Sequence, residues 1–369
     1  MKDRVLRVFE QLDPAADALV LANSIDPHLD QSFFYLFDVP SGLFEGSVAV
    51  AHRDGRLDVV SSLLEAESAE QAAKHDPSVT VHVMKDNSER ERILKAALPH
   101  PGTLALNYRE LTHEAFLQLE KVFPSAKWAD ASSAIRKVRM VKDASEIERI
   151  ERAALIGSAV AKKIPAMLHT GITELELAAG IEYAMNREGA SGRSFATIAG
   201  FGPDGAEPHF APGARKLEPG MSIVCDFGAY YRRYASDITR SFHFGPRDEE
   251  MKRVHDTVLE AQNEALAMVR DGAIAKDVHG AAQKVIDASP WKGRFTHGLG
   301  HSIGLAVHDG FGMNHLVEEP LRTGMTITVE PGIYLPGKGG VRIEDDIVVT
   351  DTGYRFLTKA PREYLEVPA

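Results

Sequence analysis

The chain has almost no cysteine and no long apolar run, and both shortages narrow its class. Its 369 residues include one cysteine, Cys225, which excludes an internal disulfide framework and a metal cluster held by cysteines. No segment approaches the apolar length that crosses a bilayer, and the charged N-terminus lacks the apolar core of a signal peptide. We therefore expect a soluble protein of the reducing cytoplasm, without a membrane partner and with Cys225 packed as a small apolar residue.

Positive charge is also in short supply. The chain has 42 Lys and Arg against 53 Asp and Glu, a net charge of −11, and no block of consecutive basic residues. Bulk electrostatics therefore argue against nucleic acid or an anionic membrane surface as a partner. Because 44% of the residues are hydrophobic, a chain of this length can bury a sizeable core, and we expect two domains.

Residues 1–138 are expected to form the smaller, N-terminal domain, with a mixed α/β pattern. Short apolar runs predict buried strands, alternating runs around an Asp-Gly pair predict a hairpin, and apolar residues at helical spacing predict helices between them. The predicted strands are 17–22, 32–39, 79–83 and 103–106, the hairpin is 47–61, and the helices are 88–98 and 112–122. The histidines of this domain are scattered, and no catalytic set is evident.

A basic connector at 135–141 leads into the second domain, residues 139–369. The sequence DASEIE that follows has the pattern of a capping box between Ser145 and Glu148. We therefore expect a long helix to begin there.

The second domain contains an internal repeat. Residues 217–226 (LEPGMSIVCD) match residues 321–330 (LRTGMTITVE) position for position, at an offset of 104 (321 minus 217). The helical segment that begins at Gly171 has a looser counterpart at Gly272. Two copies of a unit made of helix, turn, strand and terminal acid predict a duplicated domain with a pseudo-two-fold axis, because a solenoid needs more copies.

Each copy of the repeat brings two acids. Residues 217–240 read as a strand, a tyrosine-rich turn and a second strand, with Asp226 and Asp237 beside apolar rows; Glu330 and Glu344 are their counterparts in the second copy. Taken alone, Asp226 and Asp237 fit a solvated turn as well as a buried site. A pseudo-two-fold axis would bring all four acids together, and buried carboxylates need a cation or a proton.

Three histidines stand between the two pairs of acids. His297, His301 and His308 fall within twelve residues and are separated by glycines, which disfavours a helix and lets the imidazoles approach a common target. The candidate metal ligands, four carboxylates and one imidazole, are Asp226, Asp237, His301, Glu330 and Glu344. Four carboxylates predict two divalent ions, and the set suits Mn, Co, Zn or Fe(II) without selecting one. Such a pair activates water and polarises a carbonyl, so we expect hydrolysis at neutral pH.

Five motifs in order, DFGA, SDITR, HGLGHSIGLAVHD, VEPGIY and RIEDD, make residues 145–358 similar to the pita-bread metallopeptidases. That family includes aminopeptidase P, prolidase, methionine aminopeptidase and creatinase. The N-terminal domain resembles the one found in aminopeptidase P, prolidase and creatinase in size, position and α/β pattern. The resemblance implies an α+β fold with a duplicated pita-bread domain, two divalent ions with manganese as the first choice, and a homodimer.

The resemblance also assigns roles by position in the motifs. The four acids and His301 match the five ligand positions of the family, and Glu330 also matches the proton acceptor from the nucleophilic water. His308 corresponds to the histidine that contacts the scissile peptide, and His209 to the histidine on the substrate side. His297 resembles a further active-site histidine, and Arg342 could contact the substrate or tune the last ligand.

The reaction implied is cleavage of an Xaa-Pro bond in a dipeptide or at the N-terminus of a small peptide. Proline lacks an N–H and has a fixed φ, so its peptide bond calls for a dedicated pocket. Because all five metal-ligand positions are retained, two alternatives are disfavoured: a creatinase-like C–N hydrolase and a non-catalytic pita-bread binding module. Dipeptidase and aminopeptidase stay nearly even, because many prolidase-like members have an arginine shortly after the position of His308, where this chain has Gly312.

Overall fold

The computed structural model describes residues 1–369 and divides into two compact units, 1–139 and 140–369. None of the helices combines the length and the apolar character that a membrane crossing requires.

The first unit is built on one mixed six-stranded sheet with the order β4-β3-β2-β1-β5-β6. Its strands are β1 (Ala18–Ala22), β2 (Val48–His52), β3 (Leu57–Ser62), β4 (Val79–Met84), β5 (Thr103–Leu106) and β6 (Lys127–Asp130). Its helices are α1 (Lys2–Gln11), α2 (Gln31–Phe37), α3 (Ala66–Ala73), α4 (Asn87–Ala97), α5 (His113–Val122) and α6 (Ser132–Met140), whose last residue opens the second unit.

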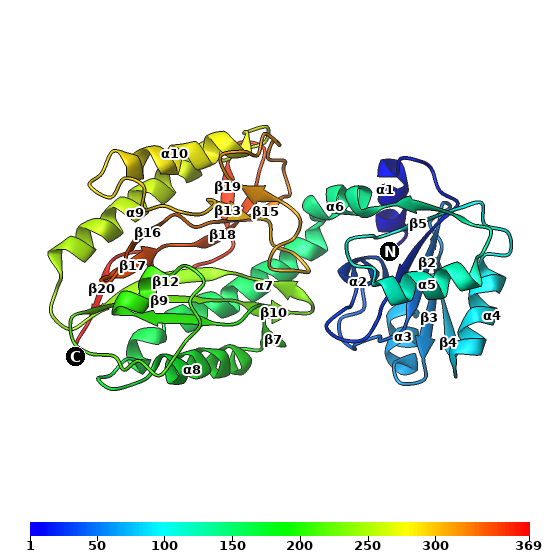
Figure 1. Ribbon diagram of the computed structural model, residues 1–369, viewed down its shortest axis with the longest axis horizontal. Coiled ribbons are helices and arrows are strands. Elements are labelled where there is room, and N and C mark those ends of the chain that lie inside the picture. Colours follow the sequence, from blue (N-terminus) through cyan, green and yellow to red (C-terminus); the bar gives the residue numbers. More distant parts are fainter. The chain divides into compact units, whose positions relative to one another are not determined.

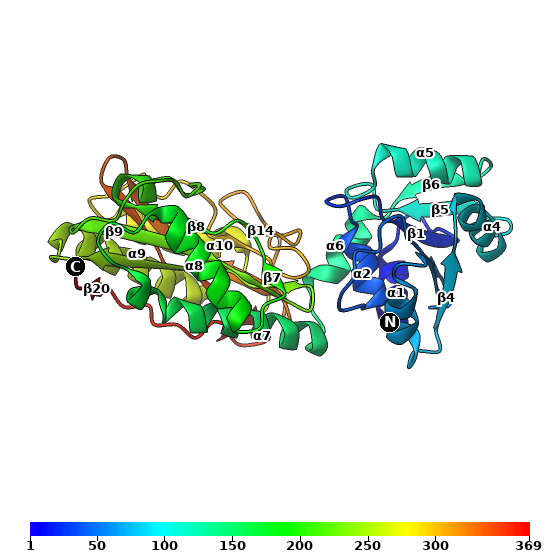
Figure 2. The same cartoon turned by 90° about the horizontal axis from the view of Figure 1, so that it is seen from below.

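Helices cover both faces of this sheet. Ala18, Val20 and Ala22, which alternate along β1, belong to a buried cluster with residues of α4 and α5, and α2 contacts β1, β2 and β3 (Figure 2). Burial on both faces explains why β1, which is buried at every residue, reads as a continuous apolar run.

One predicted strand of this unit, 32–39, is wrong. The segment forms α2, in which Ser32 and every residue from Phe33 to Phe37 are buried. Asp30 caps the helix, since its carboxylate accepts a hydrogen bond from the Ser32 N–H at 2.8 Å. A segment buried all round shows no periodicity, so a short helix and a strand cannot be told apart by pattern. The predicted connector at 135–141 is likewise helical, as part of α6.

The other predicted elements of this unit are confirmed. β2 and β3 form the antiparallel hairpin around Asp54–Gly55, and the remaining strands and both helices lie where the sequence placed them.

The second unit is made of two copies of a helix-and-strand unit. Its helices are α7 (Ala144–Ala161), η1 (Ile164–Met167), α8 (Glu174–Arg187), η2 (Gly202–Ala206), α9 (Glu249–Met268) and α10 (Ala275–Asp287). The strands of the first half and the C-terminal strand are β7 (Gly192–Arg193), β8 (Ile198–Phe201), β9 (Met221–Phe227), β10 (Ala229–Tyr231), β11 (Tyr234–Ala235), β12 (Ile238–Phe244) and β20 (Leu365–Val367). Those of the second half are β13 (Gly300–His301), β14 (Gly312–Met313), β15 (Thr326–Val329), β16 (Gly332–Leu335), β17 (Gly339–Arg342), β18 (Asp345–Val349) and β19 (Tyr354–Phe356).

The predicted duplication is confirmed by equivalent backbone hydrogen bonds. The Gly171 N–H donates to the Leu217 carbonyl at 2.9 Å, and the Gly272 N–H donates to the Leu321 carbonyl at 2.9 Å. β9 pairs antiparallel with β12 in the first half, as β15 does with β18 in the second. Figure 1 shows α9 and α10 along one side of the strands of this unit and α8 along the other.

The helix α7 begins as expected but with a different cap. Asp143, not Ser145, is the capping residue: its side chain accepts from the Glu146 N–H, and Glu146 reaches back to the Asp143 N–H. Asp and Ser are equally good at this position, so the sequence alone allowed either register.

The two halves are joined where β12 meets residues 342–346. The guanidinium of Arg240, on β12, makes five hydrogen bonds at this junction. Its acceptors are the carbonyl oxygens of Thr239, Glu344, Ala360 and Pro361 and the Asp345 carboxylate. Because these bonds hold the backbone of residues 344–345 against β12, they fix two of the predicted ligand-bearing segments relative to each other.

The close approach of β13 to β15 requires a glycine at position 300. A Cβ added to Gly300 would lie 2.1 Å from the carbonyl oxygen of Thr328. Gly312, on the neighbouring strand β14, has only one atom near its ideal Cβ, at 4.0 Å.

We therefore predict that Gly300→Ala lowers the free energy of unfolding by about 1–3 kcal/mol, the usual cost of overpacking. The measurement is the midpoint of thermal unfolding. Gly312→Ala is the matched control and should change the midpoint little; equal midpoints for the two variants would contradict the prediction.

Candidate metal and substrate site

Four predicted ligands stand at the junction of the two halves. Asp226 lies on β9, opposite Thr239 of β12, and Asp237 directly precedes β12. Glu330 directly follows β15, and Glu344 lies between β17 and β18. Asp226, Asp237 and Glu344 are buried, and Glu330 is partly buried. The pseudo-two-fold arrangement thus brings the acids together, as the sequence predicted.

All nine predicted site residues line one cavity of about 320 Å³ in the second unit. They are His209, Asp226, Asp237, His297, His301, His308, Glu330, Arg342 and Glu344. The remaining wall is largely apolar and includes Phe195, Ile198, Pro208 and Val307. The volume is at the lower end of the roughly 300–1,000 Å³ typical of small-molecule sites.

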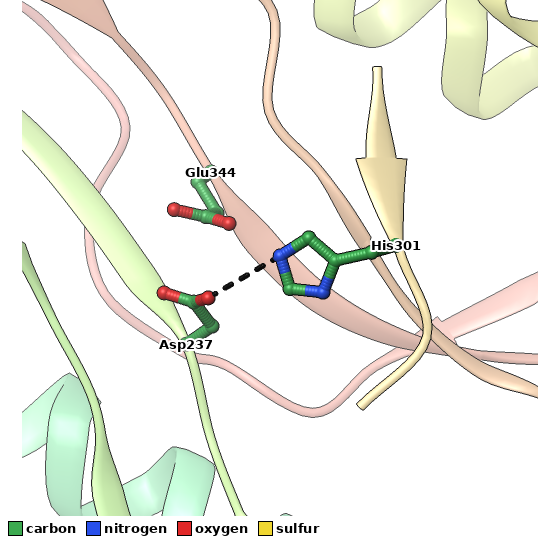
Figure 3. A group of neighbouring side chains, drawn as sticks. All are labelled: Asp237, His301 and Glu344. Atoms are coloured by element: carbon green, nitrogen blue, oxygen red, sulfur yellow. Dashed lines mark ion pairs between the residues drawn. The ribbon is translucent and has the colours of Figure 1, made fainter. Parts of the chain in front are cut away.

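Asp237, His301 and Glu344 each offer a ligand atom, and these atoms all lie within 4.8 Å of one another (Figure 3). His301 Nε2 is 3.6 Å from Asp237 Oδ2 and 3.4 Å from Glu330 Oε1. His301 Nδ1 is 3.3 Å from the Ser302 carbonyl oxygen, an acceptor that places the ring proton on Nδ1. The lone pair of Nε2 therefore faces the acids, as in a metal-ligating histidine.

The site concentrates negative charge in a buried place. Burial raises the pKa of Asp237, and the charges of Glu344, Asp226, Asp346 and Glu330 raise it further. Burial likewise raises the pKa of Glu344, with the charges of Glu330 and Asp226. Burial raises the pKa of Glu330 to about 8, although the Arg342 charge opposes the shift. Carboxylates in such a position are stabilised by cations.

Two unpaired carboxylate oxygens and one neutral imidazole are suited to bind cations. Asp226 Oδ1 and Asp237 Oδ1 are buried and have no hydrogen-bond partner in the protein. Buried polar atoms without a partner are rare, so these two oxygens call for one. Burial, followed by the His308 charge, lowers the pKa of His301 to about 3, which leaves the imidazole in its neutral, ligating form. The residues present therefore fit divalent ions.

Arg342 is the cation beside these acids, and most of its donors are used within the protein. Its Nε donates to the Thr239 hydroxyl at 2.9 Å, and one terminal nitrogen donates to the Tyr334 hydroxyl at 2.9 Å and the Pro208 carbonyl at 3.3 Å. The other terminal nitrogen donates to Asp226 Oδ2. Arg342 thus orients a ligand and still lines the cavity.

Tyr334 links Arg342 to His297, and the sequence analysis missed it. Its hydroxyl is 2.9 Å from His297 Nε2, while His297 Nδ1 is 2.8 Å from the Gly298 carbonyl oxygen. Burial raises the pKa of Tyr334 to about 12, so the hydroxyl stays protonated and donates to His297. Burial and then the Arg342 charge lower the pKa of His297 to about 4, which keeps this histidine neutral. Only its position in the VEPGIY motif could have pointed to Tyr334.

Asp346 was also missed, although a signal was present. Arg342 and Glu344 alternate along one face, and the same period of two includes Asp346. Its carboxylate is fully buried and accepts from the Asp237 N–H at 3.0 Å. The Thr239 hydroxyl, in turn, donates a hydrogen bond to Glu344 Oε2 at 2.6 Å and so orients that carboxylate.

His209 and His308 stand at the rim of the cavity, where both are exposed. The ring of His308 lies 4.2 Å from that of His301, centroid to centroid. Partial burial and the charge of His209 lower the pKa of His308. The rim histidines are therefore close enough to influence each other and to meet a substrate that enters the cavity.

Two models of known protein families match this chain. The family model of metallopeptidase family M24 matches residues 148–351, more than half of the chain. The protein belongs to this family. A second family model, the creatinase/prolidase N-terminal domain, matches residues 12–141. The predicted pita-bread fold with a creatinase-like N-terminal domain is confirmed, and membership implies binding of divalent metal.

Relatives in the family are similar over the whole chain. An Xaa-Pro dipeptidase from Pyrococcus horikoshii is 32% identical over 99% of both chains. The structure of an Xaa-Pro dipeptidase from Bacillus anthracis has a TM-score of 0.89 at 29% identity, covering 99% of each chain. That of an X-Pro aminopeptidase from Thermotoga maritima has a TM-score of 0.90 at 32% identity, covering 99% of this chain and 100% of the other.

The buried acids lead to a prediction about ion binding. Asp237→Asn should raise the thermal unfolding midpoint of the metal-free protein, because it removes a buried charge that its neighbours repel. The same variant should lose most of the rise in midpoint that divalent ions produce in the wild type. Ion binding at one thousand times the Kd contributes about 4 kcal/mol.

The measurement is thermal unfolding with and without Mn²⁺, after treatment with a chelator. Asp256→Asn, which removes an exposed acid paired with Lys252 on α9, is the control and should keep the full response. A full response in Asp237→Asn would show that Asp237 is not a ligand.

Proposed function

We propose that the protein hydrolyses the Xaa-Pro bond of dipeptides or short peptides with two divalent metal ions, manganese being the first candidate. The proposed ligands are Asp226, Asp237, His301, Glu330 and Glu344. The observation that carries the proposal is the single cavity that gathers these ligands, three further histidines and an apolar wall. The activities named for relatives that are similar along the whole chain support the choice of bond.

When bound, the ions would supply an activated water and polarise the scissile carbonyl. Glu330 is the proposed acceptor of the proton from that water. Its Oε1 lies 3.2 Å from the Thr328 hydroxyl, which fixes the orientation of the carboxylate. His308, at the rim, would contact the scissile peptide and donate to its oxygen, and His209 would contact the substrate from the opposite segment of the rim.

His297 and Arg342 are proposed to bind substrate at the inner wall. His297 is already oriented by Gly298 and Tyr334, so its ring presents a fixed face to the cavity. Arg342 makes four donor contacts within the protein, and the terminal nitrogen that binds Asp226 has a second N–H for a substrate carbonyl or carboxylate. The apolar residues Phe195, Ile198 and Val307 offer a surface suited to the proline ring.

The names of the relatives favour the dipeptidase over the aminopeptidase. Xaa-Pro dipeptidases from Pyrococcus horikoshii and Pyrococcus furiosus and prolidase structures are among the similar proteins, although an X-Pro aminopeptidase structure is equally similar. A cavity of about 320 Å³ also suits a short substrate.

The deciding experiment is a chromatographic time course on Mn-loaded protein with Ala-Pro and Ala-Pro-Ala-Ala, beside a chelated sample. We expect cleavage of Ala-Pro, and a slower or absent release of alanine from the longer peptide. Glu330→Gln should reduce kcat by about 10²–10⁴-fold, the usual contribution of a general base. Glu188→Gln, which removes an exposed acid paired with Lys163, should have no effect.

Faster turnover of the longer peptide would instead identify an aminopeptidase. If neither peptide is cleaved while metal is bound, hydrolysis is rejected and the protein is a binding module.

A second prediction concerns Arg342. Arg342→Lys keeps the charge but cannot contact Thr239, Tyr334, Pro208 and Asp226 at once, because an ammonium has three donors on one atom. We expect kcat/KM to fall by roughly tenfold or more, since every 1.4 kcal/mol of lost stabilisation is tenfold. Lys359→Arg, an exchange of exposed cations at a residue 3.8 Å from Glu151, tests whether such a swap matters in general. Unchanged kinetics in Arg342→Lys would show that charge alone is needed.

A further inference from the structure

The rim residue His209 is carried by a segment that leaves the sheet and returns to one helix end. Residues 202–212 follow β8, contain η2 and Pro208, and meet the start of α8 again at Gly213. His209 itself is exposed, so its own packing does little to fix its place. What holds the two ends of this segment therefore determines where the imidazole stands.

A single carboxylate holds both ends. Glu174, the first residue of α8, is fully buried. Its Oε1 accepts from the Phe201 N–H at 2.8 Å, and its Oε2 accepts from the Gly213 N–H at 2.9 Å. One side chain thus satisfies the backbone donors that flank residues 202–212.

The backbone closes the same segment without this carboxylate. The Glu174 N–H donates to the Arg215 carbonyl at 3.2 Å, and the Leu175 N–H donates to the Gly213 carbonyl at 3.2 Å. Thr173 also forms an isolated bridge with Lys216. The start of α8 would therefore pair with residues 213–216 through main-chain atoms alone.

The second copy of the repeat provides an internal comparison. There Ala275 takes the place of Glu174: its N–H donates to the Glu319 carbonyl at 3.2 Å, and the Lys276 N–H donates to the Val317 carbonyl at 2.9 Å. The equivalent isolated bridge joins Ile274 and Pro320. The same backbone closure thus forms with an alanine, so the carboxylate is an addition specific to the half that carries His209.

Burying the Glu174 carboxylate costs free energy, and the backbone closure at the start of α8 does not require it. Burial raises the pKa of Glu174, as expected where the charged form is disfavoured. Asp204, inside the segment, adds a like charge, which the nearby Arg215 partly offsets through its hydrogen bond to Asp204 Oδ1 at 2.9 Å. A costly buried group that is not needed for the local fold points to a role in the adjacent site.

We propose that Glu174 is a positioning residue for His209: by fixing both ends of residues 202–212, its carboxylate determines where the imidazole stands at the cavity rim. The proposal rests on the function proposed above for His209. Arg342 holds the same segment between its ends, through the Pro208 carbonyl at 3.3 Å, so Glu174 secures the two ends and Arg342 the residue next to His209.

The test uses two variants of Glu174 in the full-length protein. Glu174→Ala copies the second half of the repeat, and Glu174→Gln keeps the volume but replaces one accepting oxygen with an NH2 group, which donates and cannot accept. Both should lower kcat/KM for Ala-Pro by roughly 10- to 100-fold, as small misplacements of positioning groups do. The ion-dependent rise in unfolding midpoint should stay unchanged, because the metal ligands lie on other elements.

Glu176→Gln is the matched control. Glu176 lies two residues further along α8 and is exposed, and its carboxylate accepts from the Thr173 N–H at 2.8 Å to cap the helix. This variant removes a favourable negative charge from the same helix end without touching residues 202–212. It should keep wild-type kinetics; a loss equal to that of Glu174→Gln would show that only the stability of α8 matters and would overturn the proposal.

A double-mutant cycle with His209→Ala tests whether Glu174 acts through the histidine. In the His209→Ala background, Glu174→Ala should change kcat/KM by less than about twofold, because the two losses share one cause. If the loss of kcat/KM in the double variant equals the product of the two single losses, the proposal is overturned, even if each single variant is impaired.

Hydrogen exchange supplies a readout that does not depend on turnover. Amides of residues 202–212 should exchange faster in both Glu174 variants than in the wild type and in Glu176→Gln, while those of β9 and β12 should not change. Unchanged exchange in 202–212 would reject the positioning role. An inactive wild type that still shows the exchange difference would reject the proposed function and leave the hold on this segment standing.

Discussion

The second unit must hold several buried carboxylates close together against their mutual repulsion, and the rest of its structure follows from this constraint. Asp226, Asp237, Glu344 and Asp346 are buried close together, with Glu330 beside them. The guanidinium of Arg342 stands among them, and that of Arg240, which already pairs with Asp345, lies near Asp346. These two cations cannot offset that many acids, so the arrangement is complete only with further positive charge. The duplicated fold, the glycine at position 300 and the junction at β12 all serve to hold these charges in place against their mutual repulsion.

Hydrogen bonds around the acids are arranged so that each ligand keeps free acceptor capacity. Thr239 binds Glu344, Thr328 binds Glu330, and Arg342 binds Asp226, each through one oxygen. His301 is oriented by a backbone carbonyl on its far nitrogen. Supporting groups therefore fix the direction of the ligands without occupying the atoms that would meet a cation, which is the usual division of labour around metal sites.

Sequence patterns predicted the parts of this protein in which chemistry and periodicity agree. The repeat at 217–226 and 321–330 predicted the duplication, and the pseudo-two-fold axis that it implies predicted the convergence of the acids. Glu174 was out of reach because it acts through contacts with residues 27 and 39 positions away, which no local pattern encodes. Tyr334 was missed because its contact with His297 spans 37 residues, although its place in the VEPGIY motif was a signal. The segment 32–39 was misread for the opposite reason: a helix buried all round offers no period to detect, and its cap, Asp30, lies just outside the apolar run.

The five bonds of Arg240 have a consequence for the order in which the molecule can be assembled. Its partners Glu344, Asp345, Ala360 and Pro361 follow it by 104 to 121 residues. During synthesis the first half of the duplicated unit leaves the ribosome with this guanidinium still unpaired. Because the contacts with Glu344 and Asp345 lie 104 and 105 residues after Arg240, the junction that holds the acids can close only when both halves are present, so the site cannot be built outward from the first half alone.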